Sequence, residues 1–122
     1  MILSATLLIA AAALQPAPDW RPLADNAEVI IAWNAAGVSR QGDLVLVPVR
    51  VTPRPPRTGA NAYSIARIEL RCAANQARVA LTENYADDGT PGQRDTETLP
   101  FAAISEGTIF ETLRNQACAP GR

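Results

Sequence analysis

The sequence contains no histidine, and this absence excludes several kinds of enzyme site. A Ser-His-Asp triad, a Cys-His dyad and a histidine-ligated metal centre all need an imidazole. No phosphate-binding motif is present either. We therefore predict no catalytic residue, no metal ligand and no cofactor, and we expect a protein that is not an enzyme.

Lysine is absent as well, so all 11 positive charges are arginines, and they nearly balance 12 acidic residues. The formal net charge is −1. A protein that binds nucleic acid needs a basic surface to neutralise phosphates, so nucleic acid is not an expected partner. A chain of 122 residues that is 48% hydrophobic can bury a core and corresponds to one domain.

Long hydrophobic runs are missing except at the N-terminus, where residues 2–14 are apolar apart from one serine and one threonine. This run is too short to span a bilayer, which takes about 20 apolar residues. It has the length of a signal-peptide core, small residues lie near its end at Ala11, Ala12 and Ala13, and two prolines follow it. We expect residues 1–17 to be a cleaved signal peptide.

This expectation places residues 18–122 outside the cytoplasm, in the periplasm or at the cell surface, without a transmembrane span. No basic residue precedes the apolar run, as the n-region of a signal peptide would require. The alternative is an uncleaved N-terminal helix that anchors the protein.

The sequence has only two cysteines, Cys72 and Cys118. In an exported protein an even number of cysteines indicates disulfide bonding, and two cysteines allow one intramolecular pair. A bond that closes a loop of this size stabilises the fold by about 4 kcal/mol in the chain-entropy model. If the protein is not exported, the alternative is a pair of reduced, buried thiols.

Four segments have the composition of β-strands: residues 28–33, 44–51, 63–72 and 76–85. In the second segment every other residue is valine, which predicts one buried face. In the third segment apolar residues alternate with Arg67, Glu69 and Arg71, as in an antiparallel strand with one face in solvent. Cys72 falls on the apolar face of this strand.

Proline and glycine mark the segments between these strands. Pro48 cannot donate a hydrogen bond to a neighbouring strand, so we expect the strand 44–51 to lie at an edge of the sheet or to carry a bulge there. Residues 34–37, 41–43, 73–75 and 87–92 read as turns or loops, and residues 52–59 as a proline-rich loop that exposes Arg54 and Arg57.

The C-terminal segment has the pattern of a helix. Ser105 is a candidate N-cap, with Ile104 and Ile109 in the positions of a hydrophobic staple. Apolar residues recur at helical spacing from Ile109 to residue 117, and Cys118 lies at the predicted end of the helix. These elements predict an α+β fold, an antiparallel sheet with a C-terminal helix packed on one face and a disulfide between the two layers.

Several residues along the chain also follow one another in an order that is typical of a known protein family. Trp20 follows the predicted signal peptide, and Gly42 lies in a turn between two strands. The remaining members of the series are Tyr63-Ser64, Cys72, Tyr85, Asp88-Gly89, Phe101, Ser105 and Cys118. In this order and spacing the sequence resembles the bacterial surface-adhesin protein E-like family over nearly the whole mature chain.

This resemblance implies an exported, disulfide-bonded domain of sheet and helix, and the family name implies adhesion to host matrix proteins. The sequence departs from the family pattern in two places. Phe101 stands where the family usually has tryptophan, and Ala103-Ile104 replaces the usual Pro-Gly before the helix.

Charge is distributed unevenly along the chain. Residues 50–71 hold five arginines and one acid, whereas residues 83–97 hold five acids and one arginine. The basic segment contains our candidate partner-binding residues, which are Arg54, Arg57, Arg67 and Arg71. They would attract a protein or an anionic glycan. The alternative, which we favour, is that the two segments neutralise each other across the sheet.

Two further groups of side chains have the chemistry of binding sites. The acids at positions 83, 87, 88 and 95 offer oxygen ligands for calcium, but they lack the alternation of a calcium-binding loop, so a solvated turn is the better interpretation. Tyr63 and Trp33 are candidate interface anchors, although such residues more often belong to a core.

The leading hypothesis is an exported, non-enzymatic surface protein that resembles protein E-type adhesins. The alternative is a periplasmic accessory or structural protein that acts through homodimerisation or through another envelope component. Pairing at an edge strand near Pro48 would favour the alternative.

Overall fold

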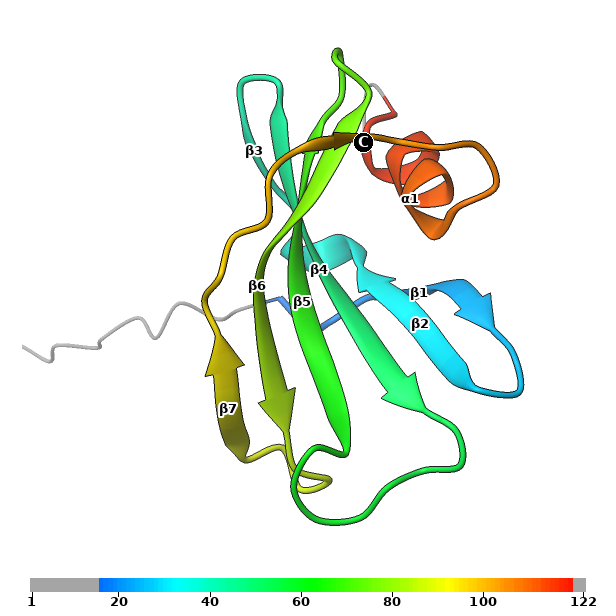
Figure 1. Cartoon of the computed structure of the whole chain (residues 1–122), viewed down its shortest axis with the longest axis vertical. Coiled ribbons are helices and arrows are strands. Elements are labelled where there is room, and N and C mark those ends of the chain that lie inside the picture. The colour runs from blue at the N-terminus through cyan, green and yellow to red at the C-terminus, as the bar shows by residue number, and fades with distance from the viewer. Residues whose placement is uncertain (1–15, 120–122) are drawn as a thin grey trace, which may run out of the picture.

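In the computed structural model, which describes residues 16–119, most of the chain forms one antiparallel sheet (Figure 1). The elements are β1 (Trp20–Asp25), β2 (Val29–Asn34), the 3-10 turn η1 (Ala35–Gly37), β3 (Ser39–Gln41), β4 (Leu44–Pro53), β5 (Tyr63–Arg71), β6 (Gln76–Tyr85), β7 (Pro91–Asp95), β8 (Ala102–Ala103) and α1 (Ile109–Ala117). The main strand order is β1-β2-β4-β5-β6-β7, with β3 paired to β4 and β8 to β6. The predicted α+β class is confirmed.

The four predicted strands correspond to β2, β4, β5 and β6, whose ends lie within about two residues of the expected ones. The sequence pattern missed β1, β3, β7 and β8. Three of them, β3, β7 and β8, have five residues or fewer, and β1 and β7 contain a proline. None of the four alternates apolar and polar residues regularly. They form because a neighbouring strand offers a ladder to pair with, which a local pattern does not reveal.

The prediction that Pro48 marks an edge strand or a bulge was wrong. β4 is a central strand, and its pairing with β5 is continuous through Pro48, which lies opposite Arg67. On the other side of β4 the partner changes at this point, since β2 pairs from Val49 onward and β3 pairs up to Leu46. A proline is tolerated here because it lies in the gap between two partners on that side.

The turn η1 fills this gap. The side chain of Asn34 accepts a hydrogen bond from the backbone N–H of Ala36. A β-carbon on Gly37 would come within 2.9 Å of both the Pro48 ring and the Asn34 side chain. The absence of a side chain at position 37 therefore lets the turn pack directly on Pro48.

Two loops are shorter than predicted. The proline-rich loop was expected to begin at Thr52, but β4 continues through Pro53, where it pairs with Val29 of β2. The loop expected to include Pro91 ends earlier, because β7 begins at that residue. In both places a proline lies at the end of a strand, where a missing N–H costs little.

The hydrophobic core lies between α1 and one face of the sheet. The four largest fully buried side chains are Val45, Val47, Leu70 and Leu113, from β4, β5 and α1. Alternate residues of β4 are buried as the valine pattern predicted. Trp33 is 4% exposed, so it belongs to the core and is not an exposed anchor.

The helix begins later than expected. Thr108, not Ser105, is the N-cap, and its side chain accepts a hydrogen bond from the backbone N–H of Glu111. Gly107, which lies between the predicted and the actual cap, has a positive φ of 78° and therefore cannot be part of a right-handed helix. Ile109 is therefore the first helical residue and not part of a staple. The sequence Thr-x-x-Glu at 108–111 is a capping-box signal that is consistent with this start of the helix.

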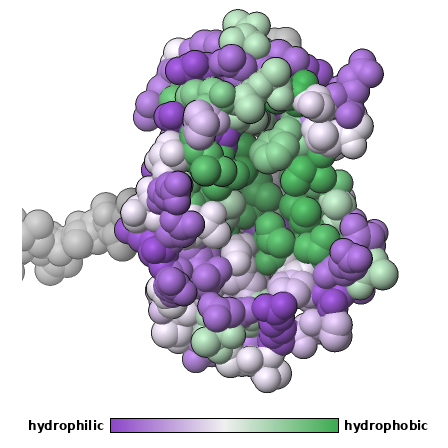
Figure 2. Space-filling view, viewed as in Figure 1, coloured by the Kyte–Doolittle hydropathy of each residue, from purple (hydrophilic) through white to green (hydrophobic). Residues whose placement is uncertain are grey.

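The short helix covers one end of the core face. Figure 1 shows α1 beside the upper ends of the strands, while their lower ends extend beyond it. Hydrophobic side chains gather in a hollow next to α1, over β2 and β4 (Figure 2). The partly buried hydrophobic residues against the core include Ile31, Ala66 and Phe110.

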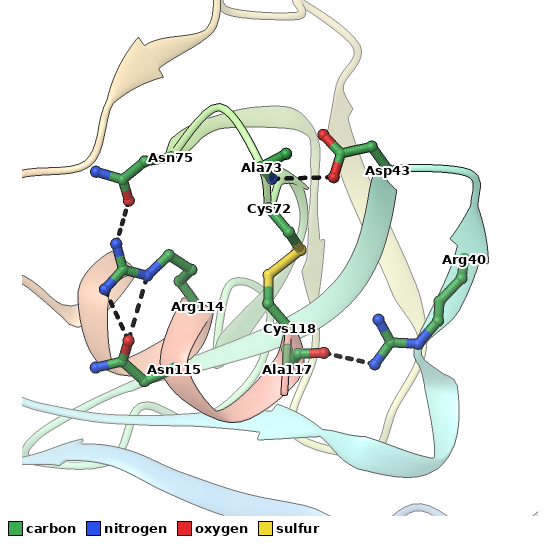
Figure 3. Close-up of a disulfide and its surroundings, with 9 residues drawn as sticks. All are labelled: Arg40, Asp43, Cys72, Ala73, Asn75, Arg114, Asn115, Ala117 and Cys118. Carbon is green, nitrogen blue, oxygen red and sulfur yellow. Dashed lines mark hydrogen bonds between the residues drawn. A yellow bond between two sulfur atoms is a disulfide. The ribbon is translucent and has the colours of Figure 1, made fainter. Parts of the chain in front are cut away.

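The predicted disulfide joins Cys72 to Cys118, with a Cα–Cα distance of 5.8 Å (Figure 3). Both cysteines pack against the core cluster. Cys72 follows β5 and Cys118 caps the C-terminus of α1, so the bond links the sheet to the helix. A side-chain oxygen of Asp43 holds the strand end by accepting a hydrogen bond from the N–H of Ala73.

A second polar contact fixes the end of the helix. The Arg40 guanidinium donates to the carbonyl of Ala117 at 2.6 Å (Figure 3). A cation favours the negative end of a helix dipole, so Arg40 stabilises α1 in addition to holding it against β3.

Candidate functional site

The face of the sheet opposite α1 carries the polar and aromatic residues that are candidates for binding; we call it the open face. The register of β4, β5 and β6 decides which side chains share it. Because Val47, Ile68 and Leu70 face the core, their neighbours along each strand point the other way. The residues concerned are Leu46, Pro48 and Arg50 of β4, Tyr63, Ile65, Arg67, Glu69 and Arg71 of β5, and Arg78, Leu81, Glu83 and Tyr85 of β6.

One end of the open face is an aromatic pair capped by an arginine. The rings of Tyr63 and Tyr85 lie opposite each other on β5 and β6 and stack with centroids 5.2 Å apart. The guanidinium of Arg50 lies 3.9 Å from the centroid of the Tyr63 ring. This distance is typical of a cation–π contact.

Tyr85 also takes part in a chain of polar contacts across β6 and β7. Its hydroxyl donates to Glu83 at 2.5 Å, and Glu83 forms an ion pair of 3.3 Å with Arg94. The hydrogen bond to the Glu83 carboxylate, followed by burial and the negative charge of Glu83, raises the pKa of Tyr85 to about 12. The Tyr85 hydroxyl therefore keeps its proton at physiological pH and remains a hydrogen-bond donor.

The opposite end of the open face is built around Phe101. Its ring lies between the guanidinium groups of Arg71 and Arg78, at 3.8 and 4.1 Å from the ring centroid. Arg78 also forms an ion pair of 2.7 Å with Glu69. Phe101 thus holds two arginines in place on the open face.

A small hollow lies between these two ends, with a volume of about 220 Å³. Its lining is mainly apolar and includes Leu46, Pro48, Ile65 and Leu81. Arg67 lies at the same hollow and is exposed. The hollow therefore combines an apolar floor with a cation at its rim.

The structure brings together only two of the four predicted partner-binding residues. Arg67 and Arg71 both lie on the open face of β5. Arg54 instead forms an ion pair of 2.6 Å with Asp25 of β1, and Arg57 is exposed in the loop between β4 and β5. The four arginines are thus divided between the open face and a loop at the end of β4.

Arg50 was not among the predicted site residues, although Tyr63 was considered as an anchor. A signal for Arg50 was present in the sequence. Because Val45, Val47 and Val49 share the buried face, Arg50 has to lie on the opposite one. The contact between Arg50 and Tyr63 depends on the register of β4 with β5, which the sequence pattern does not determine.

The expectation that the basic and acidic segments neutralise each other was wrong. The ion pairs in the described part of the chain are Arg21–Asp19, Arg54–Asp25, Arg78–Glu69 and Arg94–Glu83. None of them joins an arginine of residues 50–71 to an acid of residues 83–97. Acids of the second segment form local hydrogen bonds instead. Asp88 accepts a hydrogen bond from the backbone N–H of Thr90, and Asp95 accepts one from the backbone N–H of Glu97.

The acidic residues at positions 83–95 do not gather around a common point. Within residues 16–119 no three acidic or cysteine side chains lie close enough to hold a metal ion. The hydrogen bonds from Thr90 lower the pKa of Asp88, which keeps its carboxylate charged in an exposed turn. This local bonding describes a solvated turn.

A larger hollow of about 660 Å³ lies on the helix side, beside Trp33 and the end of α1. The indole N–H of Trp33 donates to Gln116 at 2.9 Å, and Arg21 lies 5.6 Å from the Trp33 ring centroid. Arg21 is already paired with Asp19. The polar groups at this hollow therefore bind one another and hold the helix to β2.

The comparison with protein families supports the resemblance noted in the sequence. A family model described as surface-adhesin protein E matches residues 20–119. This chain belongs to the surface-adhesin protein E family. No curated protein and no solved structure matches the chain.

Membership in this family implies a surface adhesin, and hence a protein that works outside the cytoplasm. Adhesins are typically not enzymes. Among the described residues, no helix has the length and hydrophobicity that crossing a membrane would require. The disulfide and the sheet-and-helix fold are those that the resemblance implied.

Proposed function

We propose that this protein is an exported, non-enzymatic adhesin that binds a protein or an anionic glycan through the open face of its sheet. The observation that carries the proposal is the asymmetry of the sheet. One face is occupied by the core and α1, whereas the other presents arginines, aromatic rings and an apolar hollow. Exposed arginine and tyrosine are enriched at the anchors of binding interfaces.

Export after cleavage of residues 1–17 is part of this proposal. The apolar run that motivates it, residues 2–14, falls within residues 1–15, which lie outside the described residues. Its support is the Cys72–Cys118 disulfide, because such bonds persist mainly in oxidising compartments.

The intact mass of the natively expressed protein, measured with and without reduction and alkylation, tests export. We expect a mass that has lost about 17 residues and that takes up alkylating groups only after reduction. A full-length chain with two free thiols contradicts the proposal.

A binding screen of the purified protein against matrix proteins and anionic glycans tests adhesion. We expect saturable binding that is weakened by substitution of Arg67, which is exposed on the open face, and unchanged by substitution of Arg57 in the loop. Absence of saturable binding to every surface contradicts the adhesin function.

A second candidate function is that of an envelope component that acts as a homodimer. The observation that favours it is the exposed edge of the sheet at β7, since every residue of this strand is exposed. The pairing predicted at Pro48 is not available, because β4 is a central strand. Analytical ultracentrifugation that shows only monomer at every concentration contradicts this candidate.

A further inference from the structure

Three arginines of the open face have no carboxylate partner among the described residues. Arg50 lies over Tyr63 and donates to the hydroxyl of Thr52. Arg71 lies over Phe101 and donates to the amide oxygen of Gln76. Arg67 forms no ion pair, hydrogen bond or ring contact within the described part of the chain. The positive charge of all three therefore remains available to a ligand.

The two acids of the open face are already engaged. Glu69 is paired with Arg78, and Glu83 is paired with Arg94. With these pairs neutralised, the open face keeps an excess of three positive charges although the whole chain has a net charge of −1. Such a patch attracts anions and speeds their association.

The three arginines form a line, which we call the arginine strip. Arg67 and Arg71 are four residues apart on β5, which corresponds to about 13 Å along a strand. Arg50 pairs with Ile65, so it lies one strand away and two residues along from Arg67, at about 8 Å. The strip is thus about 20 Å long and crosses from β4 to β5, which suits a linear chain with anions at intervals.

The hollow beside Arg67 indicates what kind of chain fits. A sugar ring has an apolar face of C–H groups and carries its charged substituents at the edge. The apolar lining from Leu46, Pro48 and Ile65 suits the ring face, and the Arg67 guanidinium lies at the rim, where a sulfate would be. Guanidinium groups bind planar and tetrahedral oxyanions through paired hydrogen bonds.

An acidic peptide fits this surface less well. Extended peptides gain most of their affinity by pairing their backbone with a free strand edge. The strip lies on β4 and β5, whose edges are both occupied by neighbouring strands. Only side chains are available to a ligand here. The arginines are placed to contact anionic groups, and the apolar hollow is placed to contact a sugar ring.

We propose that the arginine strip binds a sulfated polysaccharide, with one sugar ring over the hollow and its sulfate on Arg67; this inference rests on the proposed adhesin function. Arg50 and Arg71 bind further sulfates on either side. Tyr63 and Phe101 hold these two guanidinium groups in position through their ring contacts.

Binding of the full protein to immobilised heparin, which serves as the sulfated probe, tests the proposal. We expect Arg67→Gln to weaken binding by about tenfold, the loss typical of a charge-assisted hydrogen bond. Arg57→Gln is the matched control, since Arg57 is an exposed arginine of the loop, and it should change binding less than twofold. Because the Arg67 side chain forms no ion pair, hydrogen bond or ring contact with the described residues, its replacement should leave the thermal unfolding curve unchanged.

The salt dependence of binding and a comparison of probes test whether binding depends on the arginine charges and on sulfate groups. The slope of log K against log salt should fall by roughly one for each arginine of the strip that is replaced. Desulfated heparin and polyglutamate should bind at least tenfold more weakly than heparin. Equal binding of either probe, or equal effects of the Arg67 and Arg57 substitutions, overturns the proposal.

Two results separate this inference from the adhesin function. If the protein binds a matrix protein saturably, and if neither Arg67→Gln nor the salt concentration changes that binding, the polysaccharide site is overturned and the adhesin function still holds. Absence of binding to heparin and to every matrix protein overturns both.

Discussion

The carboxylate of Glu69 lies 2.7 Å from the guanidinium of Arg78, and Glu69 is the one buried charged residue of the described chain, at 7% exposure. The alternating pattern of β5 had placed Glu69 in solvent. It is buried because Arg78 on the neighbouring strand lies against it and Arg78 in turn stacks on Phe101. The ion pair therefore belongs to the architecture of the open face.

Replacement of Arg78 by alanine should destabilise the protein by about 2 kcal/mol, because it leaves the buried Glu69 charge without a partner. Arg94→Ala is the comparison, since Arg94 is paired with Glu83 but its side chain is 56% exposed. That variant should lose less than about 1 kcal/mol. Denaturant unfolding of the two variants measures the difference, and equal losses would contradict the role assigned to Glu69 burial.

Removal of the disulfide should be the most damaging change at the junction of sheet and helix. The double variant Cys72→Ser with Cys118→Ser should lose about 4 kcal/mol of unfolding free energy. The bond joins cysteines 46 positions apart, and without it the unfolded chain regains the conformational entropy that closing this loop removes. Wild-type protein unfolded under reducing conditions is the control and should show the same loss. An unchanged midpoint in denaturant would show that the bond is not formed in the native protein.

The position of the helix cap gives a paired test. Thr108→Ala should cost about 1 kcal/mol, because the side chain of Thr108 accepts from the N–H of Glu111. Ser105→Ala should cost less than about 0.5 kcal/mol, since Ser105 is exposed and lies before the cap. Thermal unfolding distinguishes the two, and a larger effect at Ser105 would move the helix start back to the residue that the sequence pattern favoured.

The core contact of α1 should be sensitive to truncation. Leu113 is 1% exposed and is the largest helix residue in the core. Leu113→Ala should destabilise the protein by about 3 kcal/mol through lost burial and the cavity left behind. Thr112→Ala on the same helix is the control, because Thr112 is not among the core residues. A loss below 1 kcal/mol for Leu113→Ala would mean that α1 does not cover the core in solution.

The titration of Tyr85 tests the polar contacts of the open face. Its pKa is raised to about 12 by the hydrogen bond to Glu83, so the folded state holds the proton more tightly than the unfolded state, whose pKa is 10.0. The resulting stability is fully present below pH 10 and is lost as the pH rises from about 10 to about 12.

Near-ultraviolet absorbance of the tyrosinate in a Tyr63→Phe background measures this titration directly. In the variant that also carries Glu83→Ala, the pKa of Tyr85 should fall back toward 10, because both the acceptor and the negative charge are gone. An unchanged pKa in that variant would contradict the assigned cause.

Much of the fold followed from local patterns in the sequence. The valines of β4 and the apolar alternation of β5 predicted their buried face, because successive side chains of a strand point to opposite sides. The pairing of Cys72 with Cys118 followed from there being only two cysteines. The start of α1 was misplaced because Ser105 and Thr108 are both acceptable caps, and only Gly107 between them decides which one is used.

The sequence by itself determined the class of the fold, the two cysteines that close it and the absence of imidazole chemistry. Tertiary structure alone decided the site. Whether an arginine is neutralised depends on which acid lies within reach, and strand register sets this. Arg54 is therefore paired with Asp25, whereas Arg67 has no acidic partner among residues 16–119. The arginine strip exists because β4 and β5 place Arg50, Arg67 and Arg71 on one face, while the acids nearby are bound to other arginines.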